Sequence, residues 1–513
     1  MPVPLRSLLK LSANDNVAVA VQQLEPGRLQ GDGFAVDIQQ PIRMGHKVAL
    51  QQIGSGEPVI KYGQVIGFAS ENIEPGCHVH SHNLQAELFE RDYAYCSTCP
   101  PPKPLPQVQR TFQGYDRGDG RFGTRNYLAI ISTVNCSASV SKYISQRIHQ
   151  TNLLQQFPQV DGVVAITHKA GCAMQYGGED HAQLDRTLAG FARHPNIAAY
   201  LLIGLGCETG QAVHLIEQEH LIQLDGSRRQ PVVLSIQDCG GIGKTVEAGV
   251  EAVARMLPSI NDIRRTTLTA DKLILGTNCG GSDGNSGITA NPALGIASDL
   301  LIEQGGASIL AETPEIYGAE HLLTRRAINR EVGEKLIERI HWWERYTGQF
   351  GVTMNNNPSP GNKDGGLTTI YEKSLGAIAK GGSTALMDVV HYAEMVTRKG
   401  LVFMDTPGYD PVSMTGIVAG GANVLVFTTG RGSVYGCKPA PSIKVATNTP
   451  LFEHMRDDMD IDAGVILQGV PVEEIGRQIF EEILAVANGK KTKSELSGVG
   501  EEEFAPWSIG PTL

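Results

Sequence analysis

The chain has 513 residues, more than one hydrophobic core usually holds, so we expect two or three domains. Its formal net charge is −11, and because no excess of Lys and Arg is available to neutralise phosphates, we exclude nucleic acids and membranes as partners. There is no run of eighteen apolar residues and no signal-peptide core, and the nine cysteines are odd in number and widely spaced. We therefore expect reduced thiols in a cytoplasmic protein.

Short β-like runs separated by turn signals fill the first hundred residues, which predicts a small all-β domain over 1–98. Within it, His78, His80 and His82 alternate along the chain, and alternate residues of a strand share one face. Together with His46, these imidazoles are candidates for a divalent metal site, although solvated histidines at a sheet edge explain the same pattern. The proline-rich stretch 99–110 predicts an extended linker.

After the linker, the pattern changes to strands separated by helical stretches. Over 111–262, β-rich runs alternate with stretches that carry apolar residues at helical spacing. This alternation is typical of βαβ units and predicts a Rossmann-like α/β domain with a largely parallel sheet. Residues 263–513 combine similar strands with glycine-rich loops, which predicts a third α/β domain.

Four cysteines each close an apolar, β-rich run: Cys136, Cys172, Cys207 and Cys279. In an open α/β sheet, ligands bind outside the carboxyl ends of the strands, so these thiols are expected to converge on a metal or catalytic centre. The alternative is that each is a small buried hydrophobe. Thiolates and imidazoles at this density suit Fe(II), Zn(II) or an iron–sulfur cluster.

Cationic side chains near strand ends or in glycine-rich loops would supply the other half of a site: Arg125, Lys363, Arg431 and Lys444. Arginine suits two-pronged binding of a carboxylate, so an anionic substrate is expected. The run 240–245 lacks the first glycine of a P-loop and does not predict a nucleotide site.

Several longer strings occur together in this chain: GHKVAL and KYGQVIGFA early, GTRN, HKAGC and GLGCE in the middle, and CGGSDGNSGITANP, NPSPGNK and TTGRGSVYG late. With them, the chain resembles the altronate/galactarate dehydratase family over nearly its whole length. The resemblance implies a SAF-type (β-clip) N-terminal domain over 1–98, a catalytic C-terminal domain, and iron(II) as the activating metal. The strings HVHSHN and HKAGC with EDH look more like the altronate branch.

The resemblance implies a hydro-lyase that converts D-altronate to 2-dehydro-3-deoxy-D-gluconate. Galactarate or another aldarate is the alternative substrate. A sulfo-lyase acting on sulfolactate and a sugar-acid-binding protein without activity are the other readings. Manganese or another divalent ion could replace iron(II), and the residues do not distinguish a single iron ion from an iron–sulfur cluster. We expect a small sugar acid as the only ligand partner and a homodimer, the commonest assembly.

Dehydration of a 2,3-dihydroxy acid removes a proton α to a carboxylate and expels hydroxide. We therefore expect Arg431 and Arg125 to hold the carboxylate, and Lys363 or His168 to act as base or acid. Other loop residues are expected to contact the substrate: Ser282, Asp283, Asn362, Thr429 and Lys444. The candidate metal ligands are Cys136, Cys172, Cys207, Cys279, His46 and His82.

Overall fold

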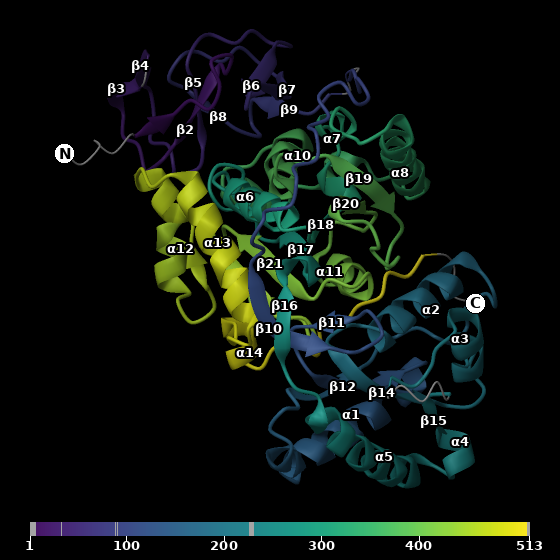
Figure 1. The fold of residues 1–513 in the computed structure, drawn as a ribbon. Helices are drawn as coiled ribbons and strands as arrows, with labels where there is room; N and C mark the ends of the chain where they lie inside the picture. Colours follow the sequence, from purple (N-terminus) through teal and green to yellow (C-terminus); the bar gives the residue numbers. More distant parts are fainter. Residues whose placement is uncertain (1–6, 32, 88, 90, 225–229, 510–513) are drawn as a thin grey trace.

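The computed structural model describes residues 7–31, 33–87, 89, 91–224 and 230–509. Its N-terminal β region, residues 7–87, contains two small sheets and a hairpin (Figure 1). The first sheet runs β1 (Leu8–Leu9), β2 (Val17–Ala20), β5 (Lys47–Ala49) and β8 (His78–Val79), and the second runs β6 (Pro58–Lys61), β7 (Gln64–Ala69) and β9 (Leu84–Gln85). The hairpin pairs β3 (Gly27–Gly31) with β4 (Phe34–Ile38). The predicted β-rich N-terminal part is confirmed.

Residues 99–110 form neither helix nor strand. They lie against the C-terminal part of the chain, where Gln109 Nε2 donates to the Gln304 carbonyl (3.1 Å) and Arg110 N donates to Gln304 Oε1 (2.7 Å). The predicted linker is therefore extended and anchored.

The middle region, residues 111–262, holds a parallel sheet in the order β13 (Gly162–Ile166), β12 (Tyr127–Ser132), β14 (Ile197–Gly204), β15 (Val232–Ser235). Alternate residues of β12 face opposite sides. Leu128 and Ile130 pack with α1 (Ala138–Gln150) and α5 (Ile242–Asp262), whereas Ala129 and Ile131 pack with α2 (Glu179–Ala192) and α3 (Ala212–Glu219). Because helices cover both faces, the strands read as continuous apolar runs. The short α4 (Ile236–Cys239) precedes α5.

The C-terminal region, from residue 263 onward, is built on a seven-stranded parallel sheet. Its spatial order is β19 (Leu386–Val390), β20 (Gly400–Met404), β18 (Ala307–Leu310), β17 (Ile274–Cys279), β21 (Val424–Thr429), β22 (Ser442–Ala446), β23 (Ile461–Asp462). The chain moves from β17 to β18 on one side and later places β21 on the other. The order therefore reverses between β17 and β21, and such a switch point is where open α/β sheets bind ligands.

Helices cover both faces of this sheet. On one face α6 (Ala290–Glu303) packs with α13 (Val472–Ala487), and on the other lies α11 (Asp410–Ala419), which also contacts α2 of the middle region. The remaining helices are α7 (His321–Thr324), α8 (Arg330–Gln349), α9 (Pro360–Asp364), α10 (Ile370–Ile378), α12 (Thr449–His454) and α14 (Lys493–Leu496). Strand β16 (Thr266–Thr269) pairs with β10 (Thr111–Asp116), which in turn pairs with β11 (Phe122–Gly123). The middle and C-terminal regions thus share a small sheet and a core.

A buried ion cluster fastens the N-terminal β region to α10. Lys47 Nζ and Lys61 Nζ each lie 2.8 Å from a different oxygen of Glu372, and the three side chains are at most 1% exposed. Burial alone would raise the pKa of Glu372, but the two ammonium groups more than offset that and hold it well below its usual range. The β region is therefore fixed over the carboxyl end of the seven-stranded sheet.

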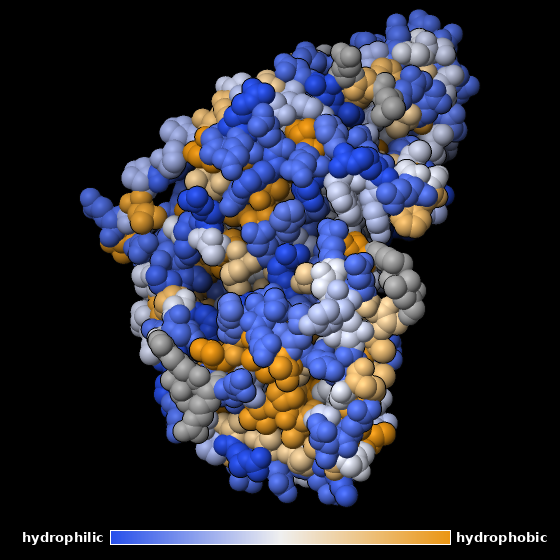
Figure 2. Space-filling view, turned by 90° about the vertical axis from the view of Figure 1, so that its right-hand side faces the viewer, coloured by the Kyte–Doolittle hydropathy of each residue, from blue (hydrophilic) through white to orange (hydrophobic). Residues whose placement is uncertain are grey.

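Apolar side chains gather on one lower face of the molecule (Figure 2). Exposed apolar residues of the middle region include Val213, Val233 and Ile242, of which Val233 belongs to β15 at the sheet edge. None of the described helices is long and apolar enough to cross a membrane.

Candidate active site

The loops that follow β17 and β21 are joined at the switch point. Gly280 N donates to the Thr428 carbonyl (3.1 Å), and Gly430 N (3.1 Å) and Arg431 N (2.8 Å) both donate to the Gly281 carbonyl. These bonds continue the pairing of the two strands beyond the sheet. The loops therefore form one shared wall at the place where the strand order reverses.

Asp283 organises this wall rather than facing solvent. Its buried carboxylate accepts hydrogen bonds from Thr447 Oγ1 (3.0 Å), Ser286 Oγ (3.0 Å) and Asn448 Nδ2 (3.2 Å). Burial raises its pKa. A Cβ on Gly430 would lie 2.2 Å from Asp283 Cγ, so only glycine lets the two loops approach this closely. The structure thus gives the predicted substrate ligand Asp283 a scaffolding role.

Three other predicted substrate ligands line the same wall. Ser282 donates nothing and accepts nothing through its buried hydroxyl, while its carbonyl accepts a hydrogen bond from Asn362 Nδ2 (2.9 Å). Thr429 Oγ1 accepts from Gly432 N (3.0 Å). The Ser282 hydroxyl is therefore buried and unpaired among the described residues, whereas Asn362 and Thr429 hold the loops.

Two of the predicted cations lie at the edge of these joined loops, which is the mouth of the candidate site. Arg431 is exposed and Lys363 is half-buried on α9. Arg431 Cδ lies 3.3 Å from the position that a Cβ on Gly365 would take, so the arginine stem packs beside the end of α9. Among the described residues neither cation has a carboxylate partner, which leaves both available to an anionic ligand.

Histidines of the N-terminal β region close over α9. His46 Nε2 contacts the Asp364 carbonyl (3.2 Å) and therefore donates, so His46 Nδ1 accepts from His78 Nε2 (3.0 Å). His80 Nε2 donates to the Lys363 carbonyl (2.9 Å). Burial lowers the pKa of His46 to about 4 and that of His78 to about 3, so both rings are neutral.

We predicted that His78, His80 and His82 share one face of a strand. Strand β8 ends at Val79, so a strand does not bring these rings together. A turn closed by His80 N to Asn83 Oδ1 (2.9 Å) returns the chain instead, and it brings the His82 ring 5.4 Å from the His78 ring. Both nitrogens of His46 are already hydrogen-bonded. The cluster thus fits a polar contact between regions better than the predicted metal site with His46 and His82.

A buried group of charged residues surrounds Cys279 at the end of β17. Lys380 Nζ lies 3.0 Å from Cys279 Sγ and 3.3 Å from Glu312 Oε2, and Lys373 Nζ lies 2.7 Å from Glu315 Oε1. One ligand atom each from Cys279, Glu312 and Glu315 lies within 4.8 Å of the other two. The second oxygens, Glu312 Oε1 and Glu315 Oε2, are buried without a hydrogen-bond partner. This donor set fits a divalent cation.

Two buried carboxyl groups here, those of Glu312 and the nearby Asp410, have raised pKa values. Burial and the neighbouring Glu315 raise the pKa of Glu312 to about 8 and that of Asp410 to about 6. Burial also raises the pKa of the Cys279 thiol. Perturbed carboxyl groups at a strand-end site are candidates for acid–base work.

Asp410 reaches over the end of β17 from the first turn of α11. Its Oδ1 accepts from Asn278 Nδ2 (3.0 Å), and its Oδ2 lies only 2.2 Å from where a Cβ on Gly280 would stand. A side chain at 280 would therefore displace the carboxylate. The stretch 279–283 connects this acid directly to the loop that carries Ser282 and Asp283.

Sequence reasoning missed five members of this group: Glu312, Glu315, Lys373, Lys380 and Asp410. The runs AETPE after β18 and DTPGYD after β20 place carboxylates just past strand ends, and the same rule applied to the cysteines would have found them. The two lysines belong to α10 and the turn after it, and no local pattern marks them.

The other three predicted thiols lie on the other sheet. Cys136, Cys172 and Cys207 follow β12, β13 and β14, and all three residues are exposed. Hydrogen bonds from Asn135 N to the Ala170 carbonyl (2.9 Å) and from Gly210 N to the Gly171 carbonyl (3.0 Å) join their loops. The prediction of one centre for all four cysteines is therefore wrong, because Cys279 is buried in the C-terminal region.

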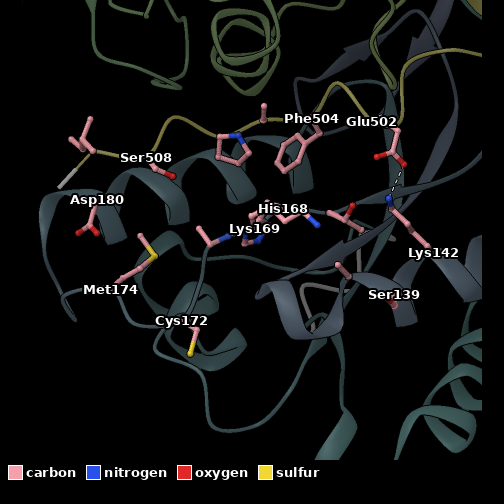
Figure 3. A pocket seen from close by; sticks show the side chains of 16 residues that line it. Ser139, Lys142, His168, Lys169, Cys172, Met174, Asp180, Glu502, Phe504 and Ser508 are labelled. Atoms are coloured by element: carbon pink, nitrogen blue, oxygen red, sulfur yellow. Dashed lines mark hydrogen bonds and ion pairs between the residues drawn. The ribbon is translucent and has the colours of Figure 1, made fainter. Parts of the chain in front are cut away.

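A cavity of about 490 Å³ opens beside one of these thiols, Cys172 (Figure 3). His168 lines it, but His168 Nε2 donates to the Ser132 carbonyl (2.9 Å) while Nδ1 accepts from Ala170 N (3.1 Å). Burial lowers its pKa to about 4. With both nitrogens used and the ring neutral, His168 shapes the loop and does not suit the predicted base.

Two predicted cations have structural roles. Arg125 is fully buried and uses all five N–H donors on the Glu495 carboxylate and the carbonyls of Thr124, Val486 and Lys490. Lys444 Nζ donates to the Tyr435 carbonyl (3.1 Å) and to Ser494 Oγ. Arg125 has no N–H donor left and Lys444 is buried against Tyr435 and Ser494, so the predicted substrate contacts of Arg125 and Lys444 are not supported.

Known protein families match the chain in three consecutive segments. Residues 6–87 match the altronate/galactarate dehydratase SAF domain, residues 114–261 the second domain of D-galactarate dehydratase/altronate hydrolase, and residues 270–512 the C-terminal part of D-galactarate/altronate dehydratase. Together these segments span most of the chain.

Whole relatives align from end to end. The chain is 35% identical to altronate dehydratase of Bacillus subtilis (strain 168), over 99% of the chain and 100% of the relative. It is 36% identical to altronate dehydratase of Escherichia coli (strain K12), over 98% and 99%. It is 39% identical to galactarate dehydratase (L-threo-forming) of the same strain, over 95% and 94%.

Proposed function

Because the chain belongs to the altronate/galactarate dehydratase family and is a hydro-lyase, we propose that it dehydrates D-altronate to 2-dehydro-3-deoxy-D-gluconate at the switch point between β17 and β21. The observation that carries this proposal is the pair of cations at that point. Arg431 and Lys363 stand beside joined loops, free of carboxylate partners among the described residues, and a sugar acid brings the missing carboxylate.

Arg431 binds the substrate carboxylate in this proposal. Its exposed guanidinium offers a planar, two-pronged donor, and the buried Ser282 hydroxyl nearby has no partner among the described residues, so it is the candidate contact for a sugar hydroxyl. Lys363 lies on α9 beside the same loops, and in this proposal its ammonium donates a proton to the departing hydroxide.

Asp410 accepts the proton from C2. A group with a pKa of about 6 is mostly ionised at neutral pH and still basic enough to take a proton in the transition state. Loss of the C2 proton and of the C3 hydroxyl, which leaves as water, gives an enol that becomes the 2-keto acid. Asn278 orients the Asp410 carboxylate for this transfer.

We also propose that a single divalent iron ion is held by Cys279, Glu312 and Glu315. The mutual approach of their ligand atoms and the two unpartnered carboxylate oxygens support this assignment. Iron, when bound, supplies a Lewis acid that withdraws negative charge from the substrate. Iron–sulfur clusters commonly use three or four thiols, so this one-thiol site favours a mononuclear ion, for which Mn²⁺ is an alternative.

The test is a substrate panel assayed with anaerobically iron-loaded protein. D-altronate, galactarate and sulfolactate are supplied separately, and 2-keto acid and sulfite are measured. We expect 2-keto acid from D-altronate. Faster turnover of galactarate would move the assignment to that alternative, and sulfite release would identify a sulfo-lyase. Binding without turnover of any of the three would indicate a binding protein.

A variant of Arg431 tests whether turnover takes place at the proposed site. Arg431→Gln is expected to raise KM for D-altronate, because it removes the carboxylate partner while leaving the buried acids in place. The matched control is Lys142→Met, a cavity-lining cation of the middle region. An unchanged KM in Arg431→Gln would remove this arginine from substrate binding.

Three further expectations also belong to this proposal: a cytoplasmic location, a homodimer, and three domains of which the middle one is Rossmann-like. The exposed apolar residues around the edge strand β15 support a self-interface (Figure 2). Light scattering of the wild type and of Val233→Asp tests the dimer, and limited proteolysis near residues 99–110 and 263 tests the domains.

A further inference from the structure

Three side chains of the middle region meet away from the proposed active site. His181 and Asp185 are one helical turn apart on α2, and His214 comes from the neighbouring α3. His181 Nε2 lies 3.6 Å from Asp185 Oδ2, and His214 Nε2 lies 3.4 Å from the same oxygen. The two imidazole rings stack with centroids 4.9 Å apart.

These separations suit a shared metal ion better than hydrogen bonds. Good hydrogen bonds from nitrogen to oxygen span about 2.7–3.2 Å, and both contacts are longer. Two ligands that each lie about 2.1 Å from an ion at a tetrahedral angle are about 3.4 Å apart. One ligand atom from each of the three residues lies within 4.8 Å of the others.

The three side chains are held in place and nearly dry. His181, Asp185 and His214 are 0%, 5% and 18% exposed. His181 Nε2 is buried without a hydrogen-bond partner among the described residues, and Asp185 Oδ2 lies 3.6 Å from it. Such an orphaned nitrogen is costly unless something binds it.

We propose that His181, Asp185 and His214 bind a divalent transition-metal ion. Two imidazoles and one carboxylate select zinc, iron(II) or a similar ion over magnesium and calcium, which prefer oxygen ligands. Three protein ligands leave coordination positions open to water or a small anion. This site is separate from the Cys279 group and does not rest on the proposed dehydration.

Neighbouring groups support a cation here. Tyr176 hydroxyl lies 3.0 Å from His214 Nδ1, and by accepting from that nitrogen it leaves Nε2 free to bind the ion. Glu179 and Asp180 occupy the first turn of α2. Their charges offset the positive end of the helix, which would otherwise repel a cation.

Binding requires one local rearrangement. Gly177 N donates to His181 Nδ1 (3.1 Å), so the ring proton lies on Nε2. An ion at Nε2 moves that proton to Nδ1, and the Gly177 N–H must then turn away. Tyr176 and Gly177 are exposed, so the turn has room to move.

Cobalt(II) is the probe, because its visible absorption reports the ligands directly. Metal-free full-length protein is titrated with Co²⁺, and the wild type is compared with His181→Gln, His214→Ala and Asp185→Asn. Each of the three is expected to bind at the site at least about tenfold more weakly than the wild type. The outer variant Tyr176→Phe is expected to weaken binding about tenfold without removing a ligand.

Two controls separate this site from other metal sites. His454→Ala removes an exposed histidine of α12 and should leave the spectrum unchanged. Cys279→Ser should lose any near-ultraviolet cobalt–thiolate band of the Cys279 group but retain the visible absorption of the nitrogen and oxygen set. Circular dichroism checks that each variant is folded. The proposal is overturned if Cys279→Ser shows no visible cobalt absorption, or if that absorption persists when His214→Ala or Asp185→Asn is added to Cys279→Ser.

Discussion

The carboxyl edges of the two parallel sheets carry cysteines at the same topological position but in opposite environments. Cys136 and Cys207 follow β12 and β14 where the middle sheet reverses its order, and Cys279 follows β17 at the reversal of the C-terminal sheet. The first two are exposed, whereas Cys279 is 2% exposed and touches Lys380. The position of a cysteine at a strand end therefore predicts which sheet edge it lies on, but not whether it is buried or exposed there.

The difference arises from what covers each edge. The N-terminal β region, fastened by Lys47, Lys61 and Glu372, closes over α9 and α10 beside the C-terminal edge. The C-terminal tail crosses the middle edge and contributes Glu502, Phe504 and Ser508 to an open cavity (Figure 3). Burial raises carboxyl pKa values and strengthens charge interactions, so the covered edge is the one suited to proton transfer.

We expect the largest effect from a substitution of Asp410 at the covered C-terminal edge. Asp410→Asn keeps the shape of the side chain and its bond to Asn278 but removes the proposed proton acceptor. We expect kcat to fall by about 10²–10⁴-fold, the usual contribution of a general base. Turnover of D-altronate is measured beside Lys142→Met, which alters only the open edge. Equal activity in the two variants would contradict the contrast between the edges.

A second test breaks the buried ion cluster that attaches the N-terminal β region to α10. Glu372→Ala leaves Lys47 and Lys61 buried without a counter-ion, which costs about 3–5 kcal/mol of stability. Urea unfolding followed by fluorescence should show an earlier transition. The control is Glu334→Ala, which breaks an exposed pair with Arg330 and should change stability by less than about 0.5 kcal/mol. Similar midpoints for both variants would mean that the cover is held by other contacts.

A third test uses pH. The raised pKa of Asp410, about 6, means that its basic form is lost as the pH falls through that value. We expect kcat/KM to decline about tenfold per pH unit below it. The residual activity of Asp410→Asn should not show this decline at low pH. A decline that persists in the variant would mean that another group titrates.

The spacing of apolar residues predicted the helices and strands well, because each of these elements is encoded within a short stretch of sequence. The apolar run of β12 and the helical spacing of α2 each reflect packing on a neighbouring element, and Gly489, with a φ of 109°, ends α13 as its position suggests. The β-rich start and the two parallel sheets followed from the same signals. Arg431 and Ser282, which follow β21 and β17, lie in the two joined loops, and their predicted contacts with substrate stay predictions.

The partners of each site residue were less predictable, because they come from distant parts of the chain. Arg125 meets Glu495, 370 positions away, and Lys380 meets Cys279 across 101 positions. His168 looked like a free base until Ser132 and Ala170 were seen to occupy both nitrogens. Whether a polar side chain is available for chemistry depends on such contacts, and spacing along the sequence does not encode them.

The smallest expected effect concerns the open edge itself. Replacement of Cys136, Cys172 and Cys207 together by serine should change stability by less than about 1 kcal/mol, because exposed thiols bury little apolar surface. It should leave iron content and turnover unchanged if the ion is held by Cys279, Glu312 and Glu315. Iron and acid-labile sulfide are measured in anaerobically purified wild type, in this triple variant and in Cys279→Ser. Loss of iron in the triple variant, with sulfide present in the wild type, would place a cluster on the open edge and reverse the contrast drawn between the two sheets.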